Sequence, residues 1–317
     1  MRPDDPVYVA GHRGLVGSAI VRRLERGGFT NLVTSARQEM DLRDEGAVRS
    51  FFARARPRYV FLAAARVGGI VANSRQPVEF LSDNLRIALS VITAAHDHEV
   101  EKLLFLGSSC IYPREAGQPM REEDLLSGKL EPTNEAYAIA KICGLKLCDA
   151  YRRQRGDDFI TVLPSNVYGP GDNFHPEDSH VMAGLLRRFH EAQAAGAREV
   201  VVWGTGRPRR EFLHADDLAD ACVLLMERYS EEAPINIGTG KDLSIRELAE
   251  LIAEVVEYKG AIRFDSSRPD GVERKMLDDA RLRGLGWAPS IPLEEGVRRT
   301  YAWYREHLGA ETAGATP

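Results

Sequence analysis

Short apolar runs alternate along the first half of the chain with longer stretches in which apolar residues recur at helical spacing. The runs lie at residues 7–10, 32–34, 59–63 and 103–106. Continuous apolar runs of this length are typical of parallel strands that are buried on both faces, and the stretches between them are typical of connecting helices. The pattern therefore predicts an α/β fold, a doubly wound parallel sheet with helices on both faces.

A glycine-rich turn joins the first of these strands to the first helix. It has the spacing GxxGxxG, which differs from the GxGxxG of the usual dinucleotide fingerprint. Glycines at this point allow close backbone approach, and the helix N-terminus offers free N–H groups to a pyrophosphate. A plain glycine-rich turn is the alternative, but the strand and helix around it favour cofactor binding. The predicted cofactor loop consists of Gly11, His12, Arg13, Gly14, Leu15, Val16 and Gly17.

The end of the second predicted strand indicates which dinucleotide binds. An NAD site places an acidic residue here for the ribose hydroxyls, whereas this chain has Arg37. A guanidinium pairs well with the 2′-phosphate of NADP, and His12 and Arg13 would add positive charge nearby. An ordinary surface arginine is the alternative. We therefore expect NADP(H) as the cofactor, with Asp41 facing its adenine.

A tyrosine and a lysine lie four residues apart in a predicted helix that follows the fourth strand. Tyr137 and Lys141 leave the same helix face one turn apart, where an ammonium tunes a phenol as a proton donor or acceptor. Ser108 comes directly after the fourth strand, at the sheet edge where α/β proteins place their ligands. The glycine turn, the strand-end serine, the tyrosine and the lysine are four signals in the right order, and a chance occurrence of all four is improbable.

These motifs resemble the extended short-chain dehydrogenase/reductase superfamily, over nearly the whole chain. Cys110 and His180 set the chain apart from plain sugar-nucleotide epimerases and dehydratases, and resemble the members that both epimerise and reduce GDP-linked 4-keto sugars. Departures at Glu135-Ala136, where Glu-Pro is common, and in the short loop at 231–233 do not affect the chemistry. The stretches that carry this resemblance are residues 64–73, 106–113, 168–176, 179–181, 210–214 and 268–271.

The resemblance implies two interleaved domains. A Rossmann-type NADP-binding domain is expected over residues 1–165, with part of 204–240 returning to it, and a mainly substrate-binding domain over 166–308. The small-residue tail at 309–317 is expected to be disordered. A Ser-x-x-Glu pattern at 244–247 predicts a capping box at the start of a helix.

The implied substrate is GDP-4-keto-6-deoxy-D-mannose, in which both carbons beside the ketone carry acidified protons. Inverting C3 and C5 needs a base and an acid on opposite faces of the sugar, and the expected pair is Cys110 and His180. Tyr137 and Ser108 would donate to the ketone oxygen, and Lys141 would bind the nicotinamide ribose. Without the resemblance, Cys110 reads as a small buried hydrophobe and His180 as a helix-start residue.

Further binding residues are expected from the same resemblance, and each is otherwise an ordinary core or surface residue. Arginine and lysine suit a diphosphate, and tryptophan offers an apolar surface and one N–H group. The additional cofactor contacts are Leu106, Gly107, Lys141, Pro164, Ser165, Asn166, Val167 and His180, and the substrate contacts are Arg188, Trp203, Arg210, Asp270 and Lys275.

Composition excludes several other classes of protein. The net charge is −5, and no block carries one sign, which argues against nucleic acid or an anionic membrane as the partner. Neither a signal-peptide core nor a membrane-length apolar stretch is present, and the four cysteines show neither CxxC spacing nor disulfide density. We expect a cytoplasmic protein without a metal, and a homodimer that pairs two long helices per subunit, at about 76–96 and 134–155.

Two other functions remain open from the sequence. One is an NAD-dependent sugar-nucleotide 4-epimerase, against which Arg37 and the Cys110/His180 pair argue. The other is an NADP-binding regulator without turnover, against which Ser108, Tyr137 and Lys141 argue, since such proteins usually lack the catalytic tyrosine.

Overall fold

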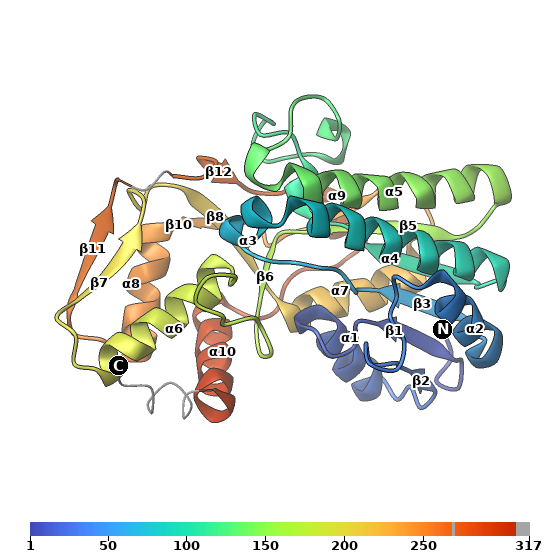
Figure 1. Cartoon of the computed structure of the whole chain (residues 1–317), viewed down its shortest axis with the longest axis horizontal. Helices are drawn as coiled ribbons and strands as arrows, with labels where there is room; N and C mark the ends of the chain where they lie inside the picture. Colours follow the sequence, from blue (N-terminus) through green and yellow to red (C-terminus); the bar gives the residue numbers. More distant parts are fainter. Residues whose placement is uncertain (268–269, 309–317) are drawn as a thin grey trace.

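A six-stranded parallel sheet forms the larger part of the molecule in the computed structural model, which describes residues 1–267 and 270–308 (Figure 1). The strand order is β2-β1-β3-β4-β5-β9. The chain leaves β1 and β3 toward opposite sides, so a crevice opens beyond their carboxyl ends, where α/β sheets bind ligands. The predicted fold class is confirmed. The strands are β1 (Val7–Ala10), β2 (Leu32–Val33), β3 (Tyr59–Leu62), β4 (Lys102–Leu106), β5 (Phe159–Pro164) and β9 (Ile235–Ile237).

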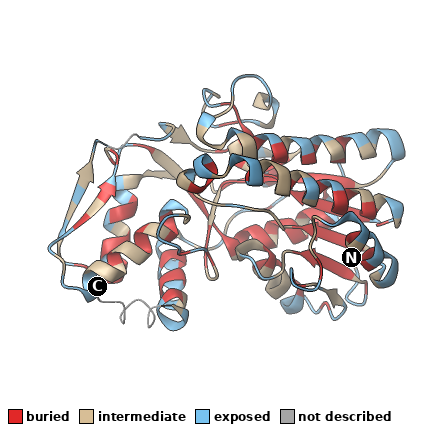
Figure 2. Ribbon diagram, viewed as in Figure 1, coloured by how far each residue is buried: buried red, intermediate tan, exposed pale blue. Residues whose placement is uncertain are grey.

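Successive residues of a strand point to opposite faces of the sheet. Because these strands are mainly apolar, both faces need cover, and helices pack on each. Val9 and Phe61 pack against one helix layer, and Tyr8 and Val60 pack against the other. Figure 2 shows the buried residues gathered along the strands and the inner helix faces. The first layer contains α1 (Leu15–Arg26) and α7 (Ala215–Arg228), and the second contains α2 (Glu45–Ala55), α4 (Pro77–Asp97) and α5 (Glu135–Arg155).

A smaller part lies at one end of the sheet, on the left of Figure 1. Its core is built around Phe189, Leu248 and Val297, which come from three different helices. One small sheet contains β10, β8 and β12, with β6 pairing to β8, and a second contains β7 and β11. The elements are β6 (Asn166–Tyr168), α6 (Val181–Ala194), β7 (Glu199–Trp203), β8 (Arg209–His214), β10 (Asp242–Ser244), α8 (Ile245–Val256), β11 (Ala261–Asp265), β12 (Arg274–Lys275) and α10 (Leu293–His307).

The chain passes between the two parts more than once. It leaves the large sheet after β5, returns with α7 and β9, and then leaves again with β10. The domain boundary expected at residue 165 stays a prediction. The expected disordered tail at 309–317, and residues 268–269 of one recognised motif, lie outside the described residues.

Two local features bear on the sequence predictions. The capping box is confirmed: the Ser244 hydroxyl accepts from the Glu247 N–H at 3.1 Å, and the Glu247 carboxylate accepts from the Ser244 N–H at 2.7 Å. The short helix α3 (Ile70–Arg75) was not predicted. Among the described residues, we find no helix with the length and apolar character needed to cross a membrane.

Candidate active site

One cavity of about 1160 Å³ contains nearly all of the predicted site residues. Its walls come from the loops after β1, β3, β4 and β5 on one side, and from α6, β7, β8 and β12 on the other. Parallel strands end together at this edge, so segments far apart in the sequence meet here. His12 and Arg13 lie outside the lining, and their contact with a cofactor stays a prediction.

The glycine loop forms a close-packed turn at one end of the cavity. Gly11 has a φ of 87°, and a Cβ on Gly17 would lie 2.0 Å from the Gly11 carbonyl oxygen. No side chain caps the start of α1 at Gly14. The first-turn N–H groups of α1 are therefore available to an anionic ligand.

An ion-pair network that the sequence did not predict lies beside Arg37. Arg43 donates to the carboxylate of Asp41 at 2.6 Å and to Asp83 at 3.0 Å. Hydrogen bonds from Arg43 lower the pKa of Asp41 to about 2. Asp41 lines the cavity but its charge is balanced by Arg43, while the exposed Arg37 lines the same end. No spacing in the sequence marks Arg43 as the partner of two carboxylates.

The Tyr137–Lys141 pair lies in the first two turns of α5, at the carboxyl edge of the sheet. The Lys141 ammonium lies 5.9 Å from the centre of the Tyr137 ring and donates to the Leu106 carbonyl at 2.7 Å. Burial lowers the pKa of Lys141 to about 7. Burial also raises the pKa of Tyr137, as does the charge of Cys110, while a hydrogen bond with Ser108 lowers it. Tyr137 is therefore a protonated phenol at neutral pH, able to donate.

Cys110 lies in the short turn of 3₁₀ helix that follows β4. The Ser108 hydroxyl accepts from the Cys110 N–H at 3.1 Å, and the Lys275 ammonium lies 3.1 Å from the Cys110 sulfur. Burial alone would raise the pKa of this thiol, but Lys275, Ser108 and Arg210 outweigh it, so the net pKa is lowered. Lowered thiol pKa values are typical of reactive cysteines.

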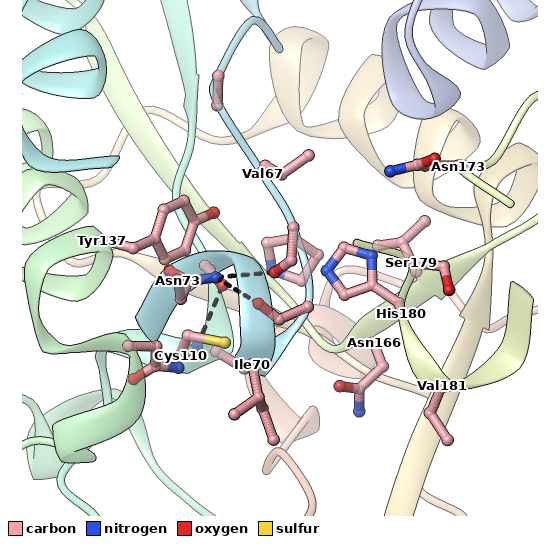
Figure 3. Close-up of a pocket in the computed structure, with 18 of the residues that line it drawn as sticks. Val67, Ile70, Asn73, Cys110, Tyr137, Asn166, Asn173, Ser179, His180 and Val181 are labelled. Atoms are coloured by element: carbon pink, nitrogen blue, oxygen red, sulfur yellow. Dashed lines mark hydrogen bonds between the residues drawn. The ribbon is translucent and has the colours of Figure 1, made fainter. Parts of the chain in front are cut away.

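His180 immediately precedes α6 and reaches the cavity from the other side. Figure 3 shows its ring and the Cys110 sulfur on opposite sides of the view, with Tyr137 on the side of Cys110. The His180 side chain is exposed to the cavity. Desolvation by the surrounding protein nevertheless lowers the pKa of the imidazole, and the charge of Lys275 lowers that pKa further. The imidazole is therefore mainly neutral at pH 7, and it shares the cavity with Cys110, whose thiol pKa is lowered.

Asn73 was missed by the sequence interpretation, which used its segment only as part of a resemblance. Its amide donates to the carbonyls of Gly68 and Gly69 at 2.8 and 3.0 Å, which fixes the loop after β3. A Cβ on Gly69 would lie 2.6 Å from the Ser179 carbonyl, so this loop packs tightly against the segment that carries His180. Asn73 thus holds the wall between Cys110 and His180 (Figure 3).

Four of the five predicted substrate residues line the far end of the cavity, and the fifth, Lys275, lies beside Cys110. Arg188 donates to the Val201 carbonyl at 2.8 Å and lies 5.7 Å from the centre of the Trp203 ring. Arg210 donates to the Val272 carbonyl at 2.6 Å. Asp270 instead accepts from the Thr205 N–H at 2.8 Å and from its hydroxyl, which ties two loops together.

Two arginines at this end lack a carboxylate partner within the described part of the chain. Arg188 and Arg210 form no salt bridge there, and burial lowers the pKa of each guanidinium. A half-buried guanidinium stays charged, and leaving it unpaired costs free energy that an anionic ligand would offset. The far end therefore favours a phosphate or diphosphate.

Other clusters give no comparable site. Over residues 1–267 and 270–308, no group of three or more His, Cys, Asp or Glu side chains is arranged to hold a metal ion. Cys143 is exposed, and Cys148 and Cys222 are buried, as ordinary surface and core thiols are.

Comparisons with known proteins agree with this geometry. Residues 7–238 match the NAD dependent epimerase/dehydratase family. GDP-L-fucose synthase 1 of Arabidopsis thaliana is 57% identical over 302 residues, which cover 95% of this chain and 94% of that protein. GDP-L-fucose synthase of Escherichia coli (strain K12) is 56% identical over 310 residues, covering 95% and 97%. The crystal structure of a GDP-L-fucose synthetase from Naegleria fowleri bound to NADP has a TM-score of 0.89 at 31% identity, covering 96% of this chain and 95% of that one.

Proposed function

This chain belongs to the NAD dependent epimerase/dehydratase family, and from that membership we propose that it is an NADP-dependent enzyme that converts GDP-4-keto-6-deoxy-D-mannose into GDP-L-fucose. The names of its relatives support this activity. The observation that carries the proposal is the presence of Cys110 and His180 in the same cavity as Tyr137 and Lys141. A reductase alone needs no second acid–base pair, whereas an epimerase-reductase does.

The glycine loop and Arg37 fit NADP(H). Gly17 packs against the Gly11 carbonyl, so the backbone is free of side chains where a pyrophosphate would approach the start of α1. Arg37 lines the same end and suits a 2′-phosphate. When bound, NADPH supplies the hydride that reduces C4 of the sugar. All other steps below use side chains of this protein.

Epimerisation starts with removal of a proton beside the ketone. The Cys110 thiolate takes this proton, so that a C–H bond breaks, an S–H bond forms and the electron pair moves onto the ketone oxygen. Tyr137 and Ser108 donate hydrogen bonds to the resulting enolate oxygen. His180 acts from its protonated form and donates a proton to the opposite face, so that an N–H bond breaks, a C–H bond forms and the electron pair returns from the ketone oxygen to the ring, and the carbon is inverted. Before the second carbon reacts, Cys110 returns its proton to water and His180 takes one up from water, and the same two groups then invert that carbon.

Reduction uses the same oxygen donor. As C4 becomes tetrahedral, Tyr137 transfers its phenolic proton to the oxygen that becomes the hydroxyl. Its raised pKa keeps that proton in place until negative charge develops. Lys141, held 5.9 Å from the ring centre, stabilises the phenolate that remains. Arg188, Arg210 and Trp203 anchor the GDP end, so the sugar stays in place between the two reactions.

We further infer that the protein is a cytoplasmic homodimer. Leu89 on α4 is 55% exposed and Ile139 on α5 is 40% exposed. The two helices lie side by side on one face of the sheet (Figure 1), and apolar side chains exposed on neighbouring helices favour pairing with a second copy.

The experiment that tests the activity is NADPH oxidation with GDP-4-keto-6-deoxy-D-mannose, followed by NMR of the products. Wild type should yield GDP-L-fucose. Tyr137→Phe should reduce turnover by about 10²-fold or more, because the proton donor is lost. Cys110→Ser should reduce epimerisation similarly while still permitting reduction, so a 4-reduced sugar with unchanged C3 and C5 accumulates. A wild-type protein that binds NADPH but leaves this sugar unchanged would refute the proposed substrate.

A further inference from the structure

The contact between Lys275 and Cys110 gives the lysine a role other than binding substrate. We propose that Lys275 is a positioning residue that holds Cys110 as the thiolate, ready to remove a proton. Its ammonium nitrogen lies 3.1 Å from the Cys110 sulfur across a sequence separation of 165 residues. The inference rests on the proposed function, since it concerns the base that epimerisation uses.

The backbone that carries Lys275 is fixed on both sides. β12 pairs in parallel with β8, which places Lys275 opposite Arg210. Side chains alternate along a strand, so the Arg274 side chain pairs with Asp242 while the Lys275 side chain points to the Cys110 sulfur. The next residue, Met276, accepts from the Met120 N–H at 2.8 Å. Lys275 is thus directed at the sulfur by strand pairing.

The charges around the sulfur favour the thiolate. Lys275 from β12 and Arg210 from β8 are cations, Tyr137 from α5 is a neutral phenol, and Ser108 adds a hydrogen bond. Lys275 forms no salt bridge with a carboxylate in the described part of the chain. A neutral thiol is only a weak acceptor, so an ammonium placed here lacks a strong partner unless the sulfur is charged.

The other cysteines show what the site adds. Cys148 and Cys222 are buried without a cation at the sulfur, and burial raises the pKa of each. Cys110 is partly exposed to the cavity, and desolvation is again the largest influence on its pKa, yet its net pKa is lowered. Desolvation acts on all three thiols, whereas Lys275 contacts Cys110. The lysine is therefore the feature whose removal should return Cys110 to the behaviour of its buried counterparts.

The test measures the thiolate directly, without substrate. The full-length protein is alkylated with iodoacetamide across a pH series, and modification of Cys110 is quantified by peptide mass spectrometry. In wild type the rate should rise with an inflection below the ordinary thiol value of about 8.5. Lys275→Met should move the inflection up by about one pH unit or more, which is about tenfold less thiolate at neutral pH. Lys275→Arg should retain the low inflection, and Lys241→Met, at an exposed position, should leave it unchanged.

The inflection distinguishes charge from access, because altered access changes the plateau rate at high pH and leaves the inflection in place. A Lys275→Met protein that inflects where wild type does would overturn the proposal. Binding of NADPH by the variant, followed by its fluorescence, serves as the check that it is folded.

A second measurement separates this role from substrate binding. In deuterium oxide with GDP-4-keto-6-deoxy-D-mannose, Lys275→Met should exchange the C3 and C5 protons about tenfold more slowly at neutral pH and recover at higher pH. A raised KM with no recovery would assign Lys275 to the diphosphate instead and contradict the proposal. If wild type does not act on this sugar, the proposed function fails, while the alkylation result still decides the role of Lys275.

Discussion

Lys141 is a buried ammonium whose hydrogen bond to the Leu106 carbonyl does not offset the loss of water around it. Its pKa of about 7 lies well below the value near 10.4 of an unfolded chain. Between these two pH values the unfolded state binds a proton at Lys141 that the folded state does not. The contribution of Lys141 to the free energy of unfolding therefore rises with pH. Active-site groups shifted in this way are retained for function at a cost in stability.

We therefore predict a pH-dependent difference between wild type and Lys141→Met in the absence of ligands. From pH 7 to pH 10, the stability of wild type relative to the variant should rise by up to about 1.4 kcal/mol per pH unit. Urea unfolding at several pH values measures this difference. A difference that is flat or falls over this range would contradict the lowered pKa.

Individual residues also show how far the sequence could predict the site. Tyr137 and Lys141 were predictable because helical spacing is a local property. The contact of Lys275 with Cys110 was not, because it depends on how β12 pairs with β8, and no local pattern encodes that pairing. Asn73 was missed for the same reason, since its carbonyl partners define a loop shape that the sequence does not display.

Helices and strands also differ in how well the sequence predicted them. The apolar runs predicted β1, β3 and β4 because a strand buried on both faces needs apolar residues throughout, and they also marked the short, half-buried β2. The helix α3 was missed, since its six residues are too few for a helical period to emerge. Between β1 and α1, Gly11, Gly14 and Gly17 look equivalent in the sequence, but the structure gives them different roles.

Alanine substitutions should separate these roles. A Cβ on Gly17 would lie 2.0 Å from the Gly11 carbonyl oxygen, whereas a Cβ on Gly14 would lie at an ordinary 3.5 Å. Gly17→Ala should destabilise the protein by about 1 to 3 kcal/mol through overpacking, and Gly14→Ala should change stability by about 0.5 kcal/mol or less. Chemical denaturation of both variants without ligands tests this. Equal stabilities would mean that α1 shifts freely relative to β1.

At the scale of the whole molecule, the cavity lies where the two parts of the chain meet. The glycine loop and Arg37 line one end, and Arg188 and Arg210 line the other. The chain crosses between the parts after β5 and again after β9, so neither part is a continuous segment. Unfolding of one part therefore disrupts strands of the other, which favours unfolding as a single cooperative unit.

Calorimetry should accordingly show one unfolding transition that both ligands move. NADPH or GDP at about 100 times its dissociation constant should each stabilise the folded state by about 2.7 kcal/mol and raise the transition temperature by a few degrees. If the two ligands occupy separate ends of the cavity, as the two sets of cations indicate, their effects should add when both are present.

Two transitions, with NADPH raising the temperature of one and GDP raising that of the other, would show that the two parts unfold independently although the chain crosses between them. A single transition that responds to NADPH but not to GDP would instead remove the role assigned to Arg188 and Arg210, because their unpaired charges are the reason to expect a diphosphate there.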